Sequence, residues 1–182
     1  MPLLATLAKS ALVTGVRPAA VAAVVLAGAA CDLLLDGPHG RHVLWGLAPD
    51  AAALVLVWLA LRAEPWAAAG GAFFLGFLRD GISAGPAGGW AMVMVAEALI
   101  IKAATGTVDI NRVWTACLVS FAAVTLSGIV LYPLLMYIYT GMSPVRVIYP
   151  YFSIYCIQGV ATAATGIPVF RLLDRAATVR GE

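Results

Sequence analysis

The sequence predicts an all-α integral membrane protein, and three observations lead to this fold class. Of its 182 residues, 63% are hydrophobic and only 11% are charged, and the mean hydropathy is +0.97. Soluble domains carry about 25% charged residues, so a soluble core of this length cannot hide so much apolar surface. The apolar residues also run continuously, without the alternation that membrane β-strands require, and we therefore expect helices to cross the bilayer.

Six apolar runs approach the length needed to cross a hydrocarbon core of about 30 Å. We expect six transmembrane helices in a single transmembrane domain that covers residues 1–182, and they lie near 17–35, 47–62, 65–79, 87–102, 113–139 and 147–173. The third and fourth runs are short, so they either cross fully or form a partly re-entrant hairpin. The fifth and sixth are long enough to need tilt or a kink, for which Pro133 and Pro150 offer places because proline removes a backbone donor.

The distribution of Lys and Arg predicts the orientation of these helices. If the N-terminus is cytoplasmic, eight of the eleven Lys and Arg residues fall on the cytoplasmic side. The positive-inside rule then places both termini in the cytoplasm. The first run also has the outline of a secretory signal, with Lys9 and Arg17 ahead of an apolar stretch that ends at Cys31. Because five further apolar runs follow, we expect an uncleaved first helix.

The tyrosines cluster in one part of the chain, around the turn between the fifth and sixth predicted helices. All six lie in this region, and they are Tyr132, Tyr137, Tyr139, Tyr149, Tyr151 and Tyr155. We expect an aromatic belt at the outer interface. The alternatives are a stacking platform for a ligand and a docking face for a partner.

A stripe of small residues marks the third predicted helix. Ala68, Ala72, Gly76 and Asp80 are spaced by four, so they share one helix face on which another helix can approach closely. Arg79 stands beside Asp80 at the outer end. This end is either a solvated or locally paired helix terminus, or an anchor for a partner's polar group.

The remaining candidate residues lie in a turn or are polar residues within the predicted membrane helices. Pro86 and Gly88 form the turn that follows Asp80. Glu97 and Gln158 fall inside apolar runs, where polar groups are costly and often functional. No second acid accompanies Glu97, so a hydrogen-bonded glutamate, or one that reaches toward the cytoplasm beside Lys102, is preferred to a proton relay.

The sequence contains none of the common catalytic or cofactor motifs. It has no Gly-x-Ser-x-Gly elbow, no Walker loop and no His-Glu-x-x-His, and no carboxylates are spaced to face one another. Asp36, His39 and His42 share a loop but do not form a recognised metal pattern. We therefore expect no enzyme activity, no metal, no cofactor and no binding to nucleic acid. We do expect contact with the lipid bilayer.

The motifs between residues 49 and 105 resemble those of MreD, the rod shape-determining membrane protein family of bacteria. The resemblance rests on Pro49-Asp50 ahead of an apolar run and Arg62, then Gly71, Gly76-Phe77-Leu78-x-Asp80 and Pro86-x-Gly88. The sequence departs from the family pattern at Arg79, where an apolar residue is usual, and at Gly81, where leucine is common.

The resemblance implies a non-enzymatic scaffold of the cell-elongation (rod) complex in the bacterial cytoplasmic membrane. It implies direct binding to MreC, with MreB filaments and wall-synthesis enzymes in the wider complex, and a role in keeping rod shape during lateral peptidoglycan synthesis. It also implies a fold similar to the membrane-embedded substrate-binding subunits of energy-coupling transporters. The alternative is a transporter subunit that binds a small solute in an outward-opening cavity lined by Glu97, Gln158 and some tyrosines.

Overall fold

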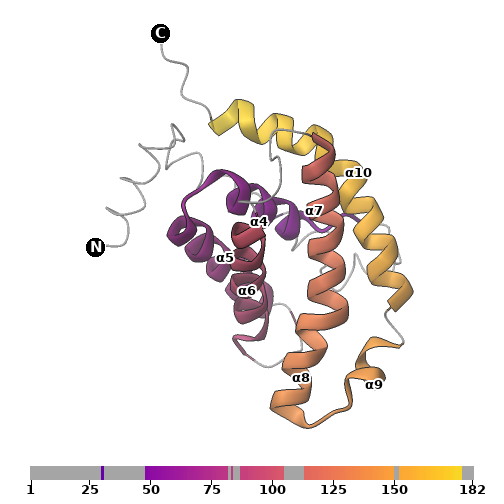
Figure 1. The fold of residues 1–182 in the computed structure, drawn as a ribbon. Coiled ribbons are helices and arrows are strands. Elements are labelled where there is room, and N and C mark those ends of the chain that lie inside the picture. Colours follow the sequence, from indigo (N-terminus) through magenta and orange to yellow (C-terminus); the bar gives the residue numbers. More distant parts are fainter. Residues whose placement is uncertain are drawn as a thin grey trace.

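The structure is a computed structural model that describes Ala30 and residues 48–81, 83, 87–104, 113–149 and 152–177. All regular structure in these ranges is helical. The predicted helix at 17–35, apart from Ala30, the loop with the two histidines, and Pro86 lie outside the described residues. Figure 1 shows two long helical runs side by side, next to a group of three shorter helices.

The three shorter helices pack together, and α4 is the most buried of them. They are α4 (Ala51–Arg62), α5 (Pro65–Asp80) and α6 (Gly89–Ala104), and they fall in the predicted ranges. Every residue of α4 from Ala52 to Ala60 is buried, as expected for a helix that is apolar on all sides and surrounded by others. The α5 helix begins with Pro65, whose fixed φ suits the first turn, and it packs chiefly on α6.

The predicted fifth helix is one continuous helical run with an irregular turn. It consists of α7 (Val113–Leu126), the π-helical segment η1 (Ser127–Leu131) and α8 (Tyr132–Thr140). The wider turn of η1 is closed by the Tyr132 N–H, which donates to the Ser127 carbonyl. The η1 segment ends at Leu131, two residues before Pro133. Pro133 has no N–H to continue the normal α-helical pattern. Gly141, with φ at 69°, then ends α8 in the left-handed conformation that glycine favours.

The predicted sixth helix, near 147–173, is wrong at its beginning. A short helix, α9 (Pro144–Ile148), already starts at Pro144, and α10 (Phe152–Ala177) begins only at Phe152. The interruption lies between Ile148 and Phe152, a stretch whose sequence includes Pro150, and a proline disfavours helical conformation in the residue before it. By length and hydropathy, Trp114–Thr140 and Phe152–Arg175 are long and apolar enough to cross a membrane. Full crossing by the shorter α4, α5 and α6 stays a prediction.

The α4 and α10 helices run parallel and in register along the whole length of α4. At one end the Asp50 backbone N–H donates to Thr162 Oγ1 at 2.9 Å, and at the other Arg62 Nη2 pairs with Asp174 Oδ2 at 2.9 Å. Both contacts join residues 112 positions apart. The first ten residues of α10 therefore extend past the Asp50 end of α4, by roughly 15 Å at 1.5 Å per residue.

The end of the bundle at Arg62 is polar. Trp58 Nε1 also donates to Asp174 Oδ1 at 3.0 Å, and Lys102 Nζ donates to the Ala63 carbonyl at 2.6 Å. The C-terminal ends of α4, α6 and α10 thus meet on one side, which is the side that the Lys and Arg count predicts to be cytoplasmic.

Candidate functional site: a buried polar junction

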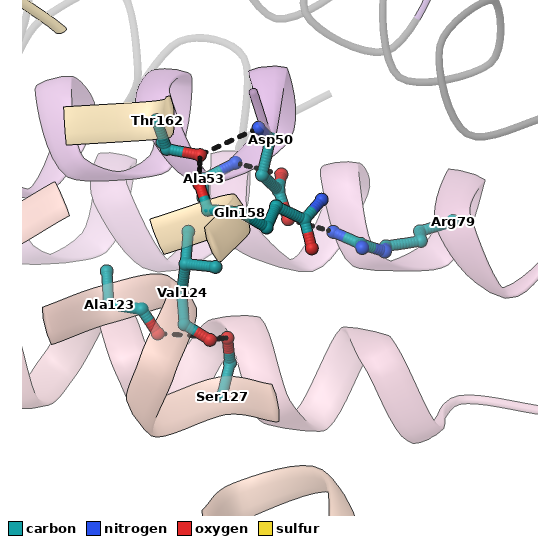
Figure 2. Close-up of polar contacts among 8 residues, drawn as sticks. All are labelled: Asp50, Ala53, Arg79, Ala123, Val124, Ser127, Gln158 and Thr162. Carbon is teal, nitrogen blue, oxygen red and sulfur yellow. Dashed lines mark hydrogen bonds and ion pairs between the residues drawn. The ribbon is translucent and has the colours of Figure 1, made fainter. Parts of the chain in front are cut away.

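Asp50 connects the start of α4 to the middle of α10. Its Oδ1 accepts a hydrogen bond from the Ala53 N–H at 2.8 Å, which caps the first turn of α4. Its own N–H is bonded to Thr162, whose hydroxyl donates to the Gln158 carbonyl at 2.7 Å (Figure 2). The aspartate thus uses both its backbone and its side chain to fix two helices that are far apart in the sequence.

The other carboxylate oxygen of Asp50 holds Arg79 at the end of α5. Arg79 Nη1 lies 2.8 Å from Asp50 Oδ2, and the two side chains are 8% and 6% exposed (Figure 2). A buried charge needs a partner of opposite sign, because its desolvation is expensive. Arg79 is therefore paired within this chain, and its partner is Asp50 at the start of α4. The sequence had drawn attention to its neighbour Asp80 instead.

Two aromatic rings extend this pair across the bundle. The guanidinium carbon of Arg79 lies 4.2 Å from the centroid of the Trp90 ring, at a distance where a cation is attracted to the ring face. Trp90 in turn stacks on Tyr132, with centroids 4.5 Å apart and planes at 13°. We call Asp50, Thr162, Arg79, Trp90 and Tyr132 the polar junction. It joins the start of α4 to α5, α6, α8 and α10.

Asp80, the last residue of α5, caps the next helix. Its Oδ1 accepts from the Trp90 N–H at 2.8 Å and its Oδ2 from the Ala91 N–H at 3.2 Å. These donors would otherwise be unpaired, because the first turn of a helix has no internal acceptors for its N–H groups. Gly88, with φ at 83°, makes the left-handed turn just before α6.

The small residues of α5 pack inside this chain. Ala68 and Ala72 are fully buried. A Cβ on Gly76 would collide with the Cα of Ala91 and would lie 2.6 Å from the Ala91 nitrogen and the Trp90 carbonyl oxygen. At Gly76, α5 and α6 are therefore in backbone contact within this chain.

Glu97 is the least satisfied polar group of α6. It is 2% exposed, and its Oε1 has no hydrogen-bond partner among the residues that the structure describes. It interacts electrostatically with Asp50, which repels it, and with Arg79, which attracts it. Glu97 also lines a cavity of about 170 Å³ between α6 and α7, whose walls include Leu61, Ile100, Ala104, Val119 and Ala122.

Gln158 does not line the cavity beside Glu97. It is buried, and Figure 2 shows its side chain pointing toward the Asp50–Arg79 pair, while the residues lining the Glu97 cavity include neither Gln158 nor a tyrosine. The five tyrosines that the structure describes divide into two groups. Tyr132 and Tyr155 pack inward, and the exposed ones are Tyr137, Tyr139 and Tyr149. The described residues thus do not assemble the solute cavity that the transporter alternative expects.

Comparison with models of known protein families shows the family of this chain. A family model described as rod shape-determining protein MreD matches residues 19–175. The chain belongs to the MreD family. No curated protein and no solved structure matches it.

Three of the residues on which the sequence resemblance to MreD rests lie in or beside the polar junction. Asp50 of the Pro-Asp pair, Gly76 and Asp80 are separated in sequence, yet all three fix the positions of α4, α5 and α6. Sequence reasoning named Asp50 only as part of the family motif and did not recognise it as the partner of Arg79. The available signal was an aspartate just before a fully apolar helix, which is typical of an N-cap.

The described residues contain no group of three His, Cys, Asp or Glu that could hold a metal ion. Cys117 and Cys156 are both free thiols. The polar junction itself consists of charged, hydroxyl and aromatic groups. What it does physically is to hold helices in fixed positions.

Proposed function

We propose that this MreD-family protein is a non-enzymatic scaffold subunit of the rod complex that binds MreC directly. MreB filaments and wall-synthesis enzymes belong to the wider complex, and the protein helps to maintain rod shape during lateral wall synthesis. It is a multi-pass protein of the bacterial cytoplasmic membrane, with one transmembrane domain and both termini in the cytoplasm.

One observation carries this proposal beyond family membership: the polar groups of the family motif are engaged within the chain. Asp50 binds Arg79 and Ala53, while Asp80 binds the backbone of α6. Charged groups that serve chemistry or transport usually face a cavity or a partner charge that can change. Here they fix helix positions, which supports a role in which the shape of the protein is what its partners recognise.

The transporter alternative has no comparable support. It needs a polar cavity that opens outward, whereas the cavity beside Glu97 is lined almost entirely by apolar side chains. That cavity lies between the C-terminal half of α6 and α7.

Affinity purification of the tagged, detergent-solubilised protein from its native membrane tests the proposal. Mass spectrometry of retained proteins and small molecules should recover MreC with wall-synthesis enzymes. A tagged membrane protein of similar size and unrelated family is the control for detergent-dependent background. Recovery of an ATPase module or a bound vitamin in place of MreC would contradict the scaffold role.

Depletion in the native host provides a second readout. Cells that lose the protein should become round, and plasmid-borne wild-type protein should restore rods. If depleted cells keep their rod shape, the proposed role in elongation is wrong.

A further inference from the structure

The cavity between α6 and α7 is an apolar groove that the proposed function leaves unexplained. Its volume is about 170 Å³, and its lining is almost wholly apolar. One face of α6, from Glu97 to Ala104, forms one side of the groove, and one face of α7, from Thr115 to Leu126, forms the other. Glu97 contributes the hydrocarbon part of its side chain, because its Oε1 is buried.

The groove is long and narrow. Its lining residues on α7 extend from Thr115 to Leu126, which is roughly 16 Å at 1.5 Å per residue. Alanines at positions 104, 122 and 123 have side chains too short to fill the space between the two helices. Spread over this length, about 170 Å³ cannot admit a helix, whose diameter is about 10 Å. The shape fits a thin, flexible chain.

The position of the groove along α7 relates it to one leaflet of a bilayer. Trp114, which is 75% exposed, directly precedes Thr115, and an exposed tryptophan at the end of a membrane helix is typical of the interface. One leaflet contributes about 15 Å, half of the hydrocarbon core. The groove therefore runs from the level of the interface to about the middle of the bilayer, which is the depth that one acyl chain covers.

The groove opens sideways, toward the surface that faces lipid in a membrane. Ile100 is 47% exposed, and Ala104 and Ala122 are also exposed. All three line the groove. A hydrocarbon chain at this surface can enter without losing any hydrogen bond, whereas a polar group would find no partner on an apolar lining.

Positive charge lies at the interfacial end of the groove. Arg62 and Lys102 each directly follow a residue that lines it. Arg62 is held by Asp174, and Lys102 by the carbonyl of Ala63, so both cations are fixed at this level. Basic residues near a membrane surface attract anionic head groups. This end therefore suits the phosphate of a lipid whose tail lies in the groove.

We propose that this groove binds one acyl chain of a phospholipid from the leaflet whose surface Trp114 marks. The acyl chain lies along α7 from Thr115 toward Leu126, and the head group lies near Arg62 and Lys102. The lipid thus fills the space that the alanines leave between α6 and α7. The inference rests on the proposed function in one respect, which is that the protein spans the membrane. It does not require any protein partner.

Photolabelling of the purified full-length protein tests the site. The protein is reconstituted without partners in vesicles of phosphatidylcholine and phosphatidylglycerol, which contain a trace of phospholipid with a diazirine in the middle of one acyl chain. Peptide mapping after irradiation should find several-fold more adduct on Ile100 and Leu126 than on Phe73. Phe73 is 56% exposed on α5 and reports random contact with lipid.

Filling the groove separates binding from random contact. Ala122→Phe should remove the adducts on Ile100 and leave those on Phe73 unchanged. Ala103→Phe is the matched control, because Ala103 is exposed on α6 and does not line the groove, and it should leave both unchanged. Ala122→Leu fills less of the space and should reduce the Ile100 adducts in part. It serves as the second variant if melting in detergent shows that Ala122→Phe does not fold.

Several outcomes would overturn the inference. Adducts spread evenly over Ile100, Leu126 and Phe73 would show random contact only, and so would an Ile100 yield that neither Ala122 variant lowers. A groove without adducts would mean that another part of this chain, such as residues 105–112, covers it. Stronger labelling by a diazirine-bearing free fatty acid than by the phospholipid would exclude the phospholipid.

These results are distinguishable from failure of the proposed function, because the labelling uses the protein alone. If the groove is labelled as expected but MreC does not co-purify from native membranes, the lipid site stands and the scaffold role fails. If MreC co-purifies but the groove is not labelled, the scaffold role stands and the lipid site is wrong.

Discussion

Asp50 and Arg79 form a buried ion pair between the first residue before α4 and the penultimate residue of α5, with 2.8 Å between Oδ2 and Nη1. The pair fixes the relative height of the two helices. Because the Asp50 backbone is also bonded to Thr162, it fixes the height of α10 as well. One residue, through its carboxylate and its backbone N–H, thus sets the register of three helices.

Breaking this pair should be far more damaging than breaking the exposed one at the opposite end. Arg79→Leu should destabilise the fold by about 3–5 kcal/mol, because it leaves a buried carboxylate without its partner. Arg62→Leu, which removes the half-exposed pair with Asp174, should cost only about 0–1 kcal/mol. Unfolding of both variants in the same detergent measures the difference. Adding Asp50→Asn to Arg79→Leu should recover part of the loss, and equal costs for the two single variants would contradict the assignment.

Gly76 and Gly70 lie on the same helix but should respond oppositely to a methyl group. A Cβ at Gly76 meets the backbone of Ala91, whereas nothing lies within 4 Å of one at Gly70. Gly76→Ala should therefore cost at least about 1–3 kcal/mol through overpacking, while Gly70→Ala should be neutral or stabilise by up to about 1 kcal/mol. Melting temperatures in detergent compare them. Similar melting temperatures for the two variants would show that α5 and α6 are not in backbone contact.

Composition and the length of the apolar runs predicted the helices between residues 47 and 140. The segments at 47–62, 65–79, 87–102 and 113–139 correspond to α4, α5, α6 and the α7–α8 run, because helix formation in apolar chains follows from the need to pair every backbone group. The predicted start of the last helix was wrong because the helical run is interrupted between Ile148 and Phe152. A run of hydropathy does not resolve such a break.

The contacts of the site were less predictable. The spacing of Ala68, Ala72 and Gly76 predicts a face for close helix contact, but it does not reveal that Gly76 faces the backbone of α6 of the same chain. Arg79 was seen as half of an Arg79–Asp80 unit because the two are adjacent. In the structure they point to different partners, Asp50 and the start of α6, and such long-range pairing is set by the fold.

The cap formed by Asp80 should protect the first turn of α6. Asp80→Ala removes the acceptor for the Trp90 and Ala91 N–H groups and should cost about 0.5–2 kcal/mol. Hydrogen exchange should become faster in the peptide that starts at Trp90. The peptide covering Ala53, whose N–H is capped by Asp50, is the internal control and should not change. Equal acceleration in both peptides would indicate global loosening, and no acceleration would mean that Asp80 is not the cap.

The contact between Gly128 and Tyr155 should show strong coupling in a double-mutant cycle. A Cβ on Gly128 would lie 2.5 Å from Cγ of the Tyr155 ring, so Gly128→Ala should force η1 and α10 apart and lower stability by about 1–3 kcal/mol. In a Tyr155→Ala background the space is open, and the same Gly128→Ala change should cost almost nothing. The coupling energy between residues in contact is typically about 0.5–3 kcal/mol, and unfolding of the four proteins in one detergent measures it.

Gly159→Ala, whose Cβ would meet Phe121 and Thr125 at 3.1 Å, provides a comparison on the same helix pair that should be insensitive to Tyr155. If the cost of Gly128→Ala is the same with and without the tyrosine ring, η1 does not pack on Tyr155, and other contacts hold the α7–α8 run against α10.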